Sequence, residues 1–402
     1  MIRPSLILAP TAAGKPAAPD LRRGPDRILA ALPRHQAPGA GLPWDVRRLD
    51  LDRAHGEEGC GFDSASPPWA EGSWPAERRA VNDPASGEQS TLKGASGGRS
   101  TRSRLQPASL TTSRGLEPPA LPGTSANPPL KDHEPLTGGH ETTGIRGDAV
   151  AAARAIAAAV APLAACGRVP LVAGGDHSVA AGSVVGVRRG LRRRYGYDVP
   201  LYLLWLDAHP DVNTPETSPS GNLHGMVLAG LLGAGPLALD TPLPAERVVL
   251  AGVRDLDPGE RAFLAARPAI RRWDVAALRG GAWQPLLAAL LQEIERRDGR
   301  LYVSLDLDVL DPAYAPGVAV PVAGGAAPSD VLALLRRVTA SGLLAGADVV
   351  ELHPAADRDG RTAALAARAL SVLAGGAILE PSYAANGAEP SIPRTGLQPA
   401  FV

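Results

Sequence analysis

Short runs of consecutive apolar residues recur along the chain, each of strand length and bounded by Gly, Pro or a charged residue. They lie at 5–9, 47–51, 169–173, 200–206, 246–251, 300–307 and 344–351, with a weaker run near 270–273. Because the runs are continuous rather than alternating, they are typical of strands that are covered on both faces of a sheet. We therefore predict an α/β, three-layer αβα fold around a mostly parallel sheet of about eight strands.

Helical patterns separate these strands. They are predicted at 25–33, 147–165, 177–194, 223–232, 258–267, 285–297, 329–341 and 360–374. A succession of strand and helix requires right-handed crossovers and puts the active site beyond the carboxyl ends of the strands. The residues that carry chemistry are therefore expected where strands end.

One long segment breaks the alternation. Residues 82–144 contain no Val, Ile, Met, Phe, Tyr or Trp, so they cannot bury enough apolar surface to offset the entropy of ordering. We predict a single catalytic domain formed by residues 1–53 and 146–376. Residues 54–145 are predicted to be a low-complexity, disordered insertion, and residues 377–402 a flexible C-terminal tail.

Charge and cysteine content exclude several classes of function. The chain has 41 Lys and Arg residues and 41 Asp and Glu residues, so its formal net charge is zero. This balance removes the basic surface that binding to nucleic acid or to an anionic membrane needs, and we expect neither partner. With only 2 cysteines, a disulfide framework or a Cys-based zinc site is excluded, and a cytoplasmic location is expected.

Ionisable residues gather where three predicted strands end. The segments are GGDHS at 174–178, DAHPD at 207–211 and DLD at 306–308. Because residues two apart in an extended strand point the same way, we expect Asp207, His209 and Asp211 to form one row. Asp306 and Asp308 would form another row, joined by His177. A lone Asp at a strand end is more often a cap or a turn residue, so the inference depends on all three segments together.

Such a cluster needs positive charge at its centre. Two divalent cations would balance the four carboxylates, and carboxylate and imidazole ligands without thiolate suit Mn²⁺ better than Fe²⁺, Co²⁺ or Zn²⁺. Two ions about 3.5–4 Å apart hold a bridging water and lower its pKa towards about 7. We predict two Mn²⁺ per subunit at a hydrolytic centre.

Six segments carry a resemblance to a known family. They are GGDHS at 174–178, DAHPDVNTP at 207–215, SGNLHGM at 220–226, GVRDLDPGE at 252–260, SLDLDVLDPAYAPG at 304–317 and VVELHP at 349–354. They resemble the ureohydrolase family, and the arginases within it most. The resemblance covers 146–375 firmly and 1–53 weakly. The metal-ligand motifs are shared with agmatinases, whereas the NTP and SGNLHG segments are more specific to arginases.

The resemblance implies a role for each site residue. One manganese would be held by His177, Asp207, Asp211 and Asp306, and the other by Asp207, His209, Asp306 and Asp308. His224 would be the proton shuttle, and Glu351 would pair with the substrate guanidinium. The remaining set would bind the substrate: Asn213, Ser220 and Asn222 at the α-carboxylate and Asp257 at the α-amino group, with Asp255 and Glu260 as support.

These roles imply hydrolysis of L-arginine to L-ornithine and urea by a homo-oligomer, either a trimer or a hexamer. One alternative is the same chemistry on another small guanidino compound, such as agmatine or guanidinobutyrate. Another is a catalytically idle binding protein. The sequence departs from the arginase pattern at Val320, which stands where a threonine is expected near the guanidinium.

Overall fold

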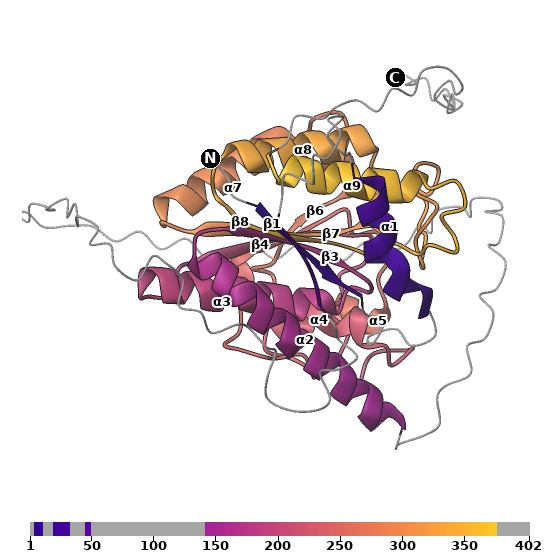
Figure 1. The fold of residues 1–402 in the computed structure, drawn as a ribbon, viewed down its shortest axis with the longest axis horizontal. Helices are drawn as coiled ribbons and strands as arrows, with labels where there is room; N and C mark the ends of the chain where they lie inside the picture. Colours follow the sequence, from indigo (N-terminus) through magenta and orange to yellow (C-terminus); the bar gives the residue numbers. More distant parts are fainter. Residues whose placement is uncertain (1–3, 11–18, 33–44, 50–140, 376–402) are drawn as a thin grey trace, which may run out of the picture. The chain divides into compact units, whose positions relative to one another are not determined.

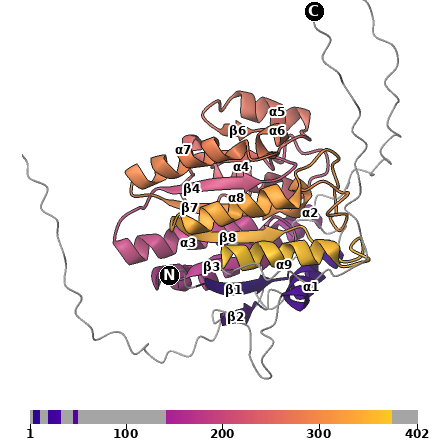
Figure 2. The same cartoon turned by 90° about the horizontal axis from the view of Figure 1, so that it is seen from above.

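Eight parallel strands form the centre of the fold (Figures 1 and 2). The computed structural model describes residues 4–10, 19–32, 45–49 and 141–375, and the sheet order in it is β2-β1-β3-β8-β7-β4-β5-β6. The strands are β1 (Pro4–Ala9), β2 (Asp45–Arg48), β3 (Val169–Gly174), β4 (Leu201–Leu206), β5 (Val248–Ala251), β6 (Arg271–Trp273), β7 (Arg300–Asp306) and β8 (Leu344–Val350). The predicted parallel sheet is therefore confirmed.

Helices cover both faces of the sheet, as the continuous apolar strands predict. They are α1 (Gly24–Ala31), α2 (Glu141–Ala165), α3 (Val179–Tyr195), α4 (Val227–Leu231), α5 (Pro258–Ala265), α6 (Val275–Leu278), α7 (Trp283–Arg296), α8 (Pro328–Ala340) and α9 (Arg361–Leu373). Figure 1 shows α7, α8 and α9 on one face and α2, α3 and α4 on the other. A hydrophobic core lies between the sheet and each helical layer. In β4, Tyr202 and Leu204 belong to the core beneath α7, α8 and α9, while Leu203 and Trp205 belong to the core beneath α2, α3 and α4. This is the three-layer αβα arrangement.

The longest helix begins earlier than the sequence predicts. α2 starts at Glu141 rather than at residue 147, so its first turn overlaps the end of the segment that we predicted as an insertion. The remainder of that segment, up to residue 140, lies outside the described residues, and so does the tail from 377. Strand β2 also differs, because it spans Asp45–Arg48 and not 47–51.

Helices α2 and α3 approach each other closely along a row of glycines. A Cβ added at Gly182 would lie 2.2 Å from the carbonyl oxygen of Ala153, and one at Gly190 would lie 2.5 Å from that of Ala161. The stretch Asp148–Ala165 of α2 is long and apolar enough to cross a membrane by composition alone. In this fold its apolar side chains, such as Ile156 and Val160, are buried in the core that α2 shares with α3.

The four central strands carry the chemistry. β3, β8, β7 and β4 are neighbours in the sheet although they are far apart in the sequence. Their carboxyl ends lead into His177, Glu351, Asp306 and Asp207 respectively. The parallel pairing brings these four ends to the same edge of the sheet, as Figure 2 shows.

Candidate metal centre and active site

The turn after β4 places three of the expected ligands, but not as one extended row. The strand ends at Leu206, and Asp211 has a left-handed backbone with φ of 51°. The backbone N–H of His209 donates to Asp207 Oδ1 at 2.6 Å, which closes the turn. The expectation of a row is wrong because the chain leaves the β conformation at Asp207, so two-residue periodicity no longer applies.

The turn after β7 corrects the second expected row in the same way. A 3₁₀ helix, Leu307–Val309, follows Asp306 directly, and the backbone N–H of Asp308 donates to Asp306 Oδ1 at 2.8 Å. Asp308 Oδ1 in turn accepts the N–H of Ala208 at 3.0 Å, which joins this turn to the one after β4. The predicted ligands meet because two turns are bonded together.

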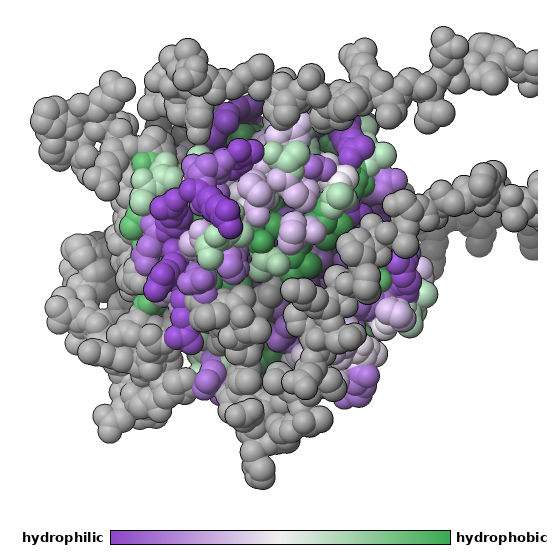
Figure 3. Space-filling model, turned by 90° about the vertical axis from the view of Figure 1, so that its right-hand side faces the viewer, coloured by the Kyte–Doolittle hydropathy of each residue, from purple (hydrophilic) through white to green (hydrophobic). Residues whose placement is uncertain are grey.

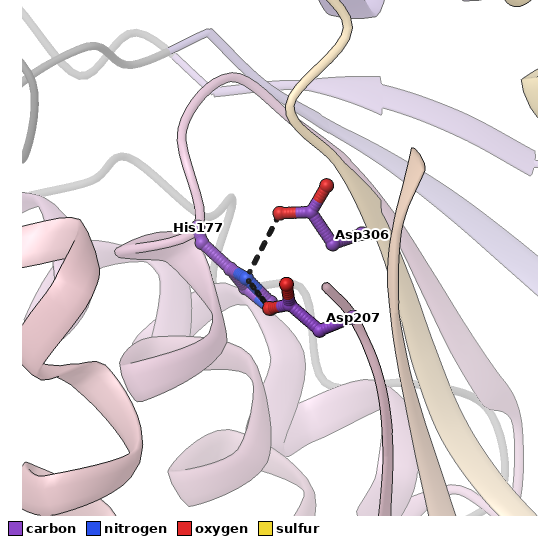
Figure 4. Close-up of side chains that lie close together, drawn as sticks. All are labelled: His177, Asp207 and Asp306. Atoms are coloured by element: carbon purple, nitrogen blue, oxygen red, sulfur yellow. Dashed lines mark ion pairs between the residues drawn. The ribbon is translucent and has the colours of Figure 1, made fainter. Parts of the chain in front are cut away.

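Two groups of ligand atoms result, and they share Asp207. His177 Nδ1 lies 3.1 Å from Asp207 Oδ2 and 3.2 Å from Asp306 Oδ2 (Figure 4). It also lies 3.1 Å from Asp211 Oδ2. His209 Nδ1 lies 3.0 Å from Asp308 Oδ2 and 3.5 Å from Asp207 Oδ1. Each oxygen of Asp207 therefore faces a different histidine, as a bridging ligand requires. Asp306 belongs to the first group, while its other oxygen accepts the bond from Asp308.

Hydrogen bonding on the far side of His177 tests whether a cation fits. Ser304 Oγ donates to Asp348 Oδ1 at 2.6 Å, so at 2.8 Å it can only accept from His177 Nε2. In the neutral imidazole, which is the form that binds a metal, the proton is then on Nε2 and Nδ1 presents a lone pair to the carboxylates. Burial lowers the pKa of His177, but its contacts with Asp207, Asp211 and Asp306 raise that pKa well above its ordinary value, so this site also holds a proton when no metal is bound. Nδ1 is buried and makes no well-oriented hydrogen bond, although three carboxylate oxygens lie within 3.2 Å. Lone pairs that converge in this way repel unless protons or a metal ion lie between them, so the residues fit a metal that replaces the protons.

A tryptophan fixes the same imidazole from its face. Trp205 stacks on His177 with 4.0 Å between ring centroids and 7° between the planes. Its indole Nε1–H donates to Asp207 Oδ2 at 2.9 Å. One side chain thus sets the position of a histidine ligand and of the shared carboxylate.

The metal-free cluster retains protons. Burial, assisted by the charge of Asp207, raises the pKa of Asp211 to about 7. Burial and the charges of Asp308 and Asp207 raise the pKa of Asp306 well above its usual range. Burial alone would lower the pKa of His209, but Asp207 and Asp308 raise it to about 12. A metal ion entering this cluster must displace protons.

A cavity of about 210 Å³ opens above the metal centre. Its lining residues are His209, Asp211, Asn213, Ser218, Ser220, His224, Gly225, Asp255, Asp257, Glu260, Asp306, Asp308, Val320 and Glu351. Asn222, which we expected at the substrate, is not among them. Ser218 and Gly225 were not predicted. His177 and Asp207 are not part of this lining and are completely buried.

The expected substrate-binding residues on one side of the cavity are bonded to one another. Asn213 Nδ2 donates to Asp257 Oδ2 at 2.8 Å, and Thr217 Oγ1 donates to Asn213 Oδ1 at 3.0 Å. The two oxygens of Glu260 accept the backbone N–H groups of Asp257 at 2.9 Å and Val212 at 3.3 Å. Glu260 thereby holds the start of α5 against the turn that carries the metal ligands. Burial raises the pKa of its carboxyl to about 8.

Glu351 reaches the cavity from the end of β8. Its backbone is left-handed, with φ of 64°, and its Oε1 accepts the backbone N–H of His177 at 3.0 Å. Asp211 and Glu351 are two of the three non-glycine residues with positive φ in the described part of the chain, and both line the cavity. Backbone strain of this kind concentrates at functional sites, because the surrounding structure must hold it in place.

Three residues that the sequence reasoning passed over support the centre. Ser304 and Asp348 are fully buried behind His177, and Arg254 is half-buried beside the ligand turns. Of these three, Asp348 could have been noticed in the sequence, because it is a charged residue inside an otherwise apolar strand.

Two residues that the sequence analysis did name lie at the edge of the site. Asp255 lies at the rim of the cavity, where its Oδ2 is 3.8 Å from His209 Nε2. His224 lies in the 3₁₀ helix Leu223–Met226 and lines the cavity.

Figure 3 shows one face of the molecule, and the surface there is mixed in character. On the face drawn in Figure 3, hydrophilic residues gather along one side, and a smaller hydrophobic area lies near the middle.

Comparisons with known proteins agree with this geometry. A sequence model described as the Arginase family matches residues 103–375. The arginase of Bacillus caldovelox is 40% identical over 227 residues, which cover 55% of this chain and 73% of that protein. Its crystal structure aligns with a TM-score of 0.62 at 25% identity, over 94% of this chain and all of the other. An arginase structure from Bacillus subtilis aligns with a TM-score of 0.52 at 33% identity, over 58% of this chain and 80% of that one.

The family match begins at residue 103 and ends with the last described residue, so it includes all the ligands and the whole cavity lining. Members of this family are hydrolases that act on the C–N bonds of small guanidino compounds at a dinuclear metal site. The ligands and the cavity of this chain have the composition that such a reaction needs. The chain belongs to the arginase family.

Proposed function

We propose that the protein is a manganese-dependent arginase that hydrolyses L-arginine to L-ornithine and urea. The observation that carries this proposal is the shared Asp207, whose two oxygens face two histidines beneath a polar cavity. Ligands of carboxylate and imidazole, without thiolate, favour Mn²⁺. His177, Asp207, Asp211 and Asp306 would hold one ion, and Asp207, His209 and Asp308, with Asp306 as a bridge, the other.

The reaction requires more than the ions. When bound, two Mn²⁺ ions lower the pKa of water and so supply a nucleophile near neutral pH. A guanidinium is resonance-stabilised and charged, so it must be oriented for attack at its carbon. Glu351 lines the cavity together with Asp306 and Asp308, where its carboxylate can pair with the guanidinium. His224 would then donate a proton to the departing amine nitrogen.

The bonded pair Asn213 and Asp257 supports an amino-acid substrate. Asn213 keeps one Nδ2–H beyond the bond to Asp257, and Ser220 adds a hydroxyl on the same cavity lining. These donors suit an α-carboxylate, and the Asp257 carboxylate suits an α-ammonium group. A substrate without those groups would leave these polar groups of the cavity without partners on the substrate, which disfavours it.

The test is urea release with Mn²⁺ from arginine, agmatine and guanidinobutyrate, with ornithine identified as the second product. Arginine should be preferred over the other two compounds. Preference for agmatine or guanidinobutyrate would assign the same chemistry to another guanidino substrate. Inactivity on all three would refute the proposal. Assembly as a trimer or hexamer and a cytoplasmic location stay predictions.

A further inference from the structure

Arg254 lies at the junction of three segments that surround the cavity. It belongs to the loop between β5 and α5, which also carries Asp255 and Asp257. Its guanidinium donates to the carbonyl oxygens of Asp308 at 2.7 Å and Val322 at 2.7 Å, and to those of Gly252 and Ala323 at 3.2 Å. Arg254 forms no salt bridge within the described ranges, so its donors serve the main chain.

The main chain of Arg254 reaches the other ligand turn. Its backbone N–H donates to the carbonyl oxygen of Ala208 at 2.9 Å, and the N–H of Asp255 donates to the same oxygen at 3.1 Å. Ala208 stands between the metal ligands Asp207 and His209. One residue is therefore bonded to the turn after β4 through its backbone and to the turn after β7 through its side chain.

The third segment is the cavity wall at residues 318–325, which contains Val320. Val320 is 41% exposed and lines the cavity with Glu351 and Asp306. At one end of the wall, Val318 forms a β-bridge with Leu352. At the other end, the N–H groups of Gly324 and Gly325 donate to Asp311 Oδ2 at 2.8 and 3.1 Å. Between these ends, for residues 319–323, the hydrogen bonds found in the described structure come from Arg254.

We propose that Arg254 is a positioning residue, which fixes the wall at 318–325 relative to the two metal-ligand turns and so sets where a guanidino substrate sits over the ions. A planar guanidinium with donors at fixed angles can bond carbonyls on several segments at once. In Arg254, Nη2 bonds both Asp308 and Val322, while Nε bonds Ala323 and Nη1 bonds Gly252. A lysine ammonium carries the same charge, but its single nitrogen cannot also replace the bonds from Nε and Nη1. The fork of donors, rather than the charge, is what the site requires.

A second arginine that contacts the same wall provides a matched control. Arg279 Nη2 donates to the carbonyl oxygens of Gly324 at 2.8 Å and Gly325 at 3.3 Å, yet Arg279 has no bond to either ligand turn. If Arg254 only stabilised the wall, replacing it would have the same effect as replacing Arg279. If Arg254 also fixes the wall relative to the metal centre, the two replacements should have different effects.

The kinetic arm of the test rests on the proposed function. Arg254→Gln, Arg254→Lys and Arg279→Gln are compared with the wild-type holoenzyme. Both Arg254 variants should keep two Mn²⁺ per subunit, while KM for arginine rises roughly tenfold and kcat changes far less, because a substrate contact is displaced and the reacting centre is kept. Arg279→Gln should leave KM unchanged. An unchanged KM in Arg254→Gln, full recovery in Arg254→Lys, or metal loss in both Arg254 variants would overturn the proposal.

A second arm needs no substrate. Hydrogen exchange of peptides that cover 318–326 should be faster in Arg254→Gln than in Arg279→Gln, while peptides from α8 and α9 exchange equally in both. Equal protection of 318–326 in the two variants would overturn the positioning role. If the wild-type enzyme releases no urea from any guanidino compound, the proposed function fails, and this arm still decides the role of Arg254.

Discussion

Asp348 Oδ1 accepts a hydrogen bond from Ser304 Oγ at 2.6 Å. Both side chains are fully buried, and neither lines the cavity. This bond turns the lone pairs of Ser304 towards His177 and so selects the imidazole tautomer that can bind a metal through Nδ1. Carboxylates behind metal-bound histidines commonly act in this way, and here a serine stands between the two groups.

Replacing Ser304 with alanine should weaken Mn²⁺ binding about 10- to 100-fold, because the Nε2–H of His177 loses its acceptor. Ser183→Ala is the control, since Ser183 Oγ also bonds Asp348, at 3.1 Å, but does not contact His177. Calorimetric titration of metal-free protein with Mn²⁺ gives both affinities. Equal affinities in the two variants would show that the link to His177 has no effect on the metal.

Asp207→Asn should lose metal and activity together, because each oxygen of Asp207 serves a different group of ligands. Asp306→Asn should do the same if Asp306 bridges the ions when they are bound. Metal analysis after gel filtration checks both variants. Two tightly held ions with full activity in either one would contradict its assignment as a bridging ligand.

His224→Ala should keep both ions while turnover falls about 10²- to 10⁴-fold, the usual contribution of a residue that transfers a proton. The reason is its position, since it lines the cavity but belongs to neither ligand group. Metal content and kcat are measured on the same preparation. Loss of metal would instead make His224 a ligand.

The metal-free protein should become less stable as pH rises from about 4 to about 7. The pKa of Asp211 has its ordinary value of 3.8 in the unfolded chain and is about 7 in the folded protein. Between these two pH values the folded state therefore holds more protons than the unfolded state. The free energy of unfolding then falls with rising pH. Thermal unfolding of metal-free wild type and Asp211→Asn checks the slope, which should be shallower in the variant.

Metal binding has the opposite pH dependence. Protons on Asp211, Asp306 and His209 compete with the ion. Mn²⁺ affinity should therefore rise with pH, through the pKa of Asp211 at about 7 and beyond it, with measurable proton release on binding. Calorimetry in two buffers with different ionisation enthalpies counts the protons. Binding without proton release at pH 6 would contradict the raised pKa values.

Val320→Thr should raise kcat/KM for arginine by roughly tenfold, which corresponds to about 1.4 kcal/mol. Valine and threonine are similar in size, and a hydrogen bond to a charged group contributes about 1.5–3 kcal/mol. The position is suitable, because Val320 and Glu351 line the same cavity. If kcat/KM for arginine is unchanged or lower in Val320→Thr, the missing hydroxyl has no role in this enzyme or another group replaces it.

The sheet could be predicted because burial on both faces leaves a direct mark on the sequence. In Leu201–Leu206 every residue is buried, so the run is apolar throughout and its length is that of the strand. The start of α2 could not be predicted in the same way. Its first residues, Glu-Thr-Thr-Gly, have no apolar periodicity, and the sequence there resembles the preceding low-complexity segment.

The candidate ligands could be selected by residue type and by their place at strand ends, but the geometry of the turns that bring them together could not be predicted. Asp211 needs a positive φ that a local pattern of Asp, His and Pro does not encode. The role of Arg254 could not be predicted from the sequence, because its hydrogen-bond partners are backbone carbonyl groups, which every residue has. Asn222 was expected from its neighbours in SGNLHGM, and the structure leaves it outside the cavity lining.

The position of β8 has a consequence for protein synthesis. Of the strands in the described part of the chain, β8 is the last to leave the ribosome, yet it pairs between β3 and β7 in the middle of the sheet. All six ligands, from His177 to Asp308, are therefore translated before the strand that joins their two halves. A nascent chain that stops short of residue 344 contains every metal-binding side chain, but its β3 and β7 have no common neighbour. The group of His177, Asp207 and Asp306 therefore depends on β8, whereas Asp207, His209 and Asp308 follow β4 and β7, which pair directly.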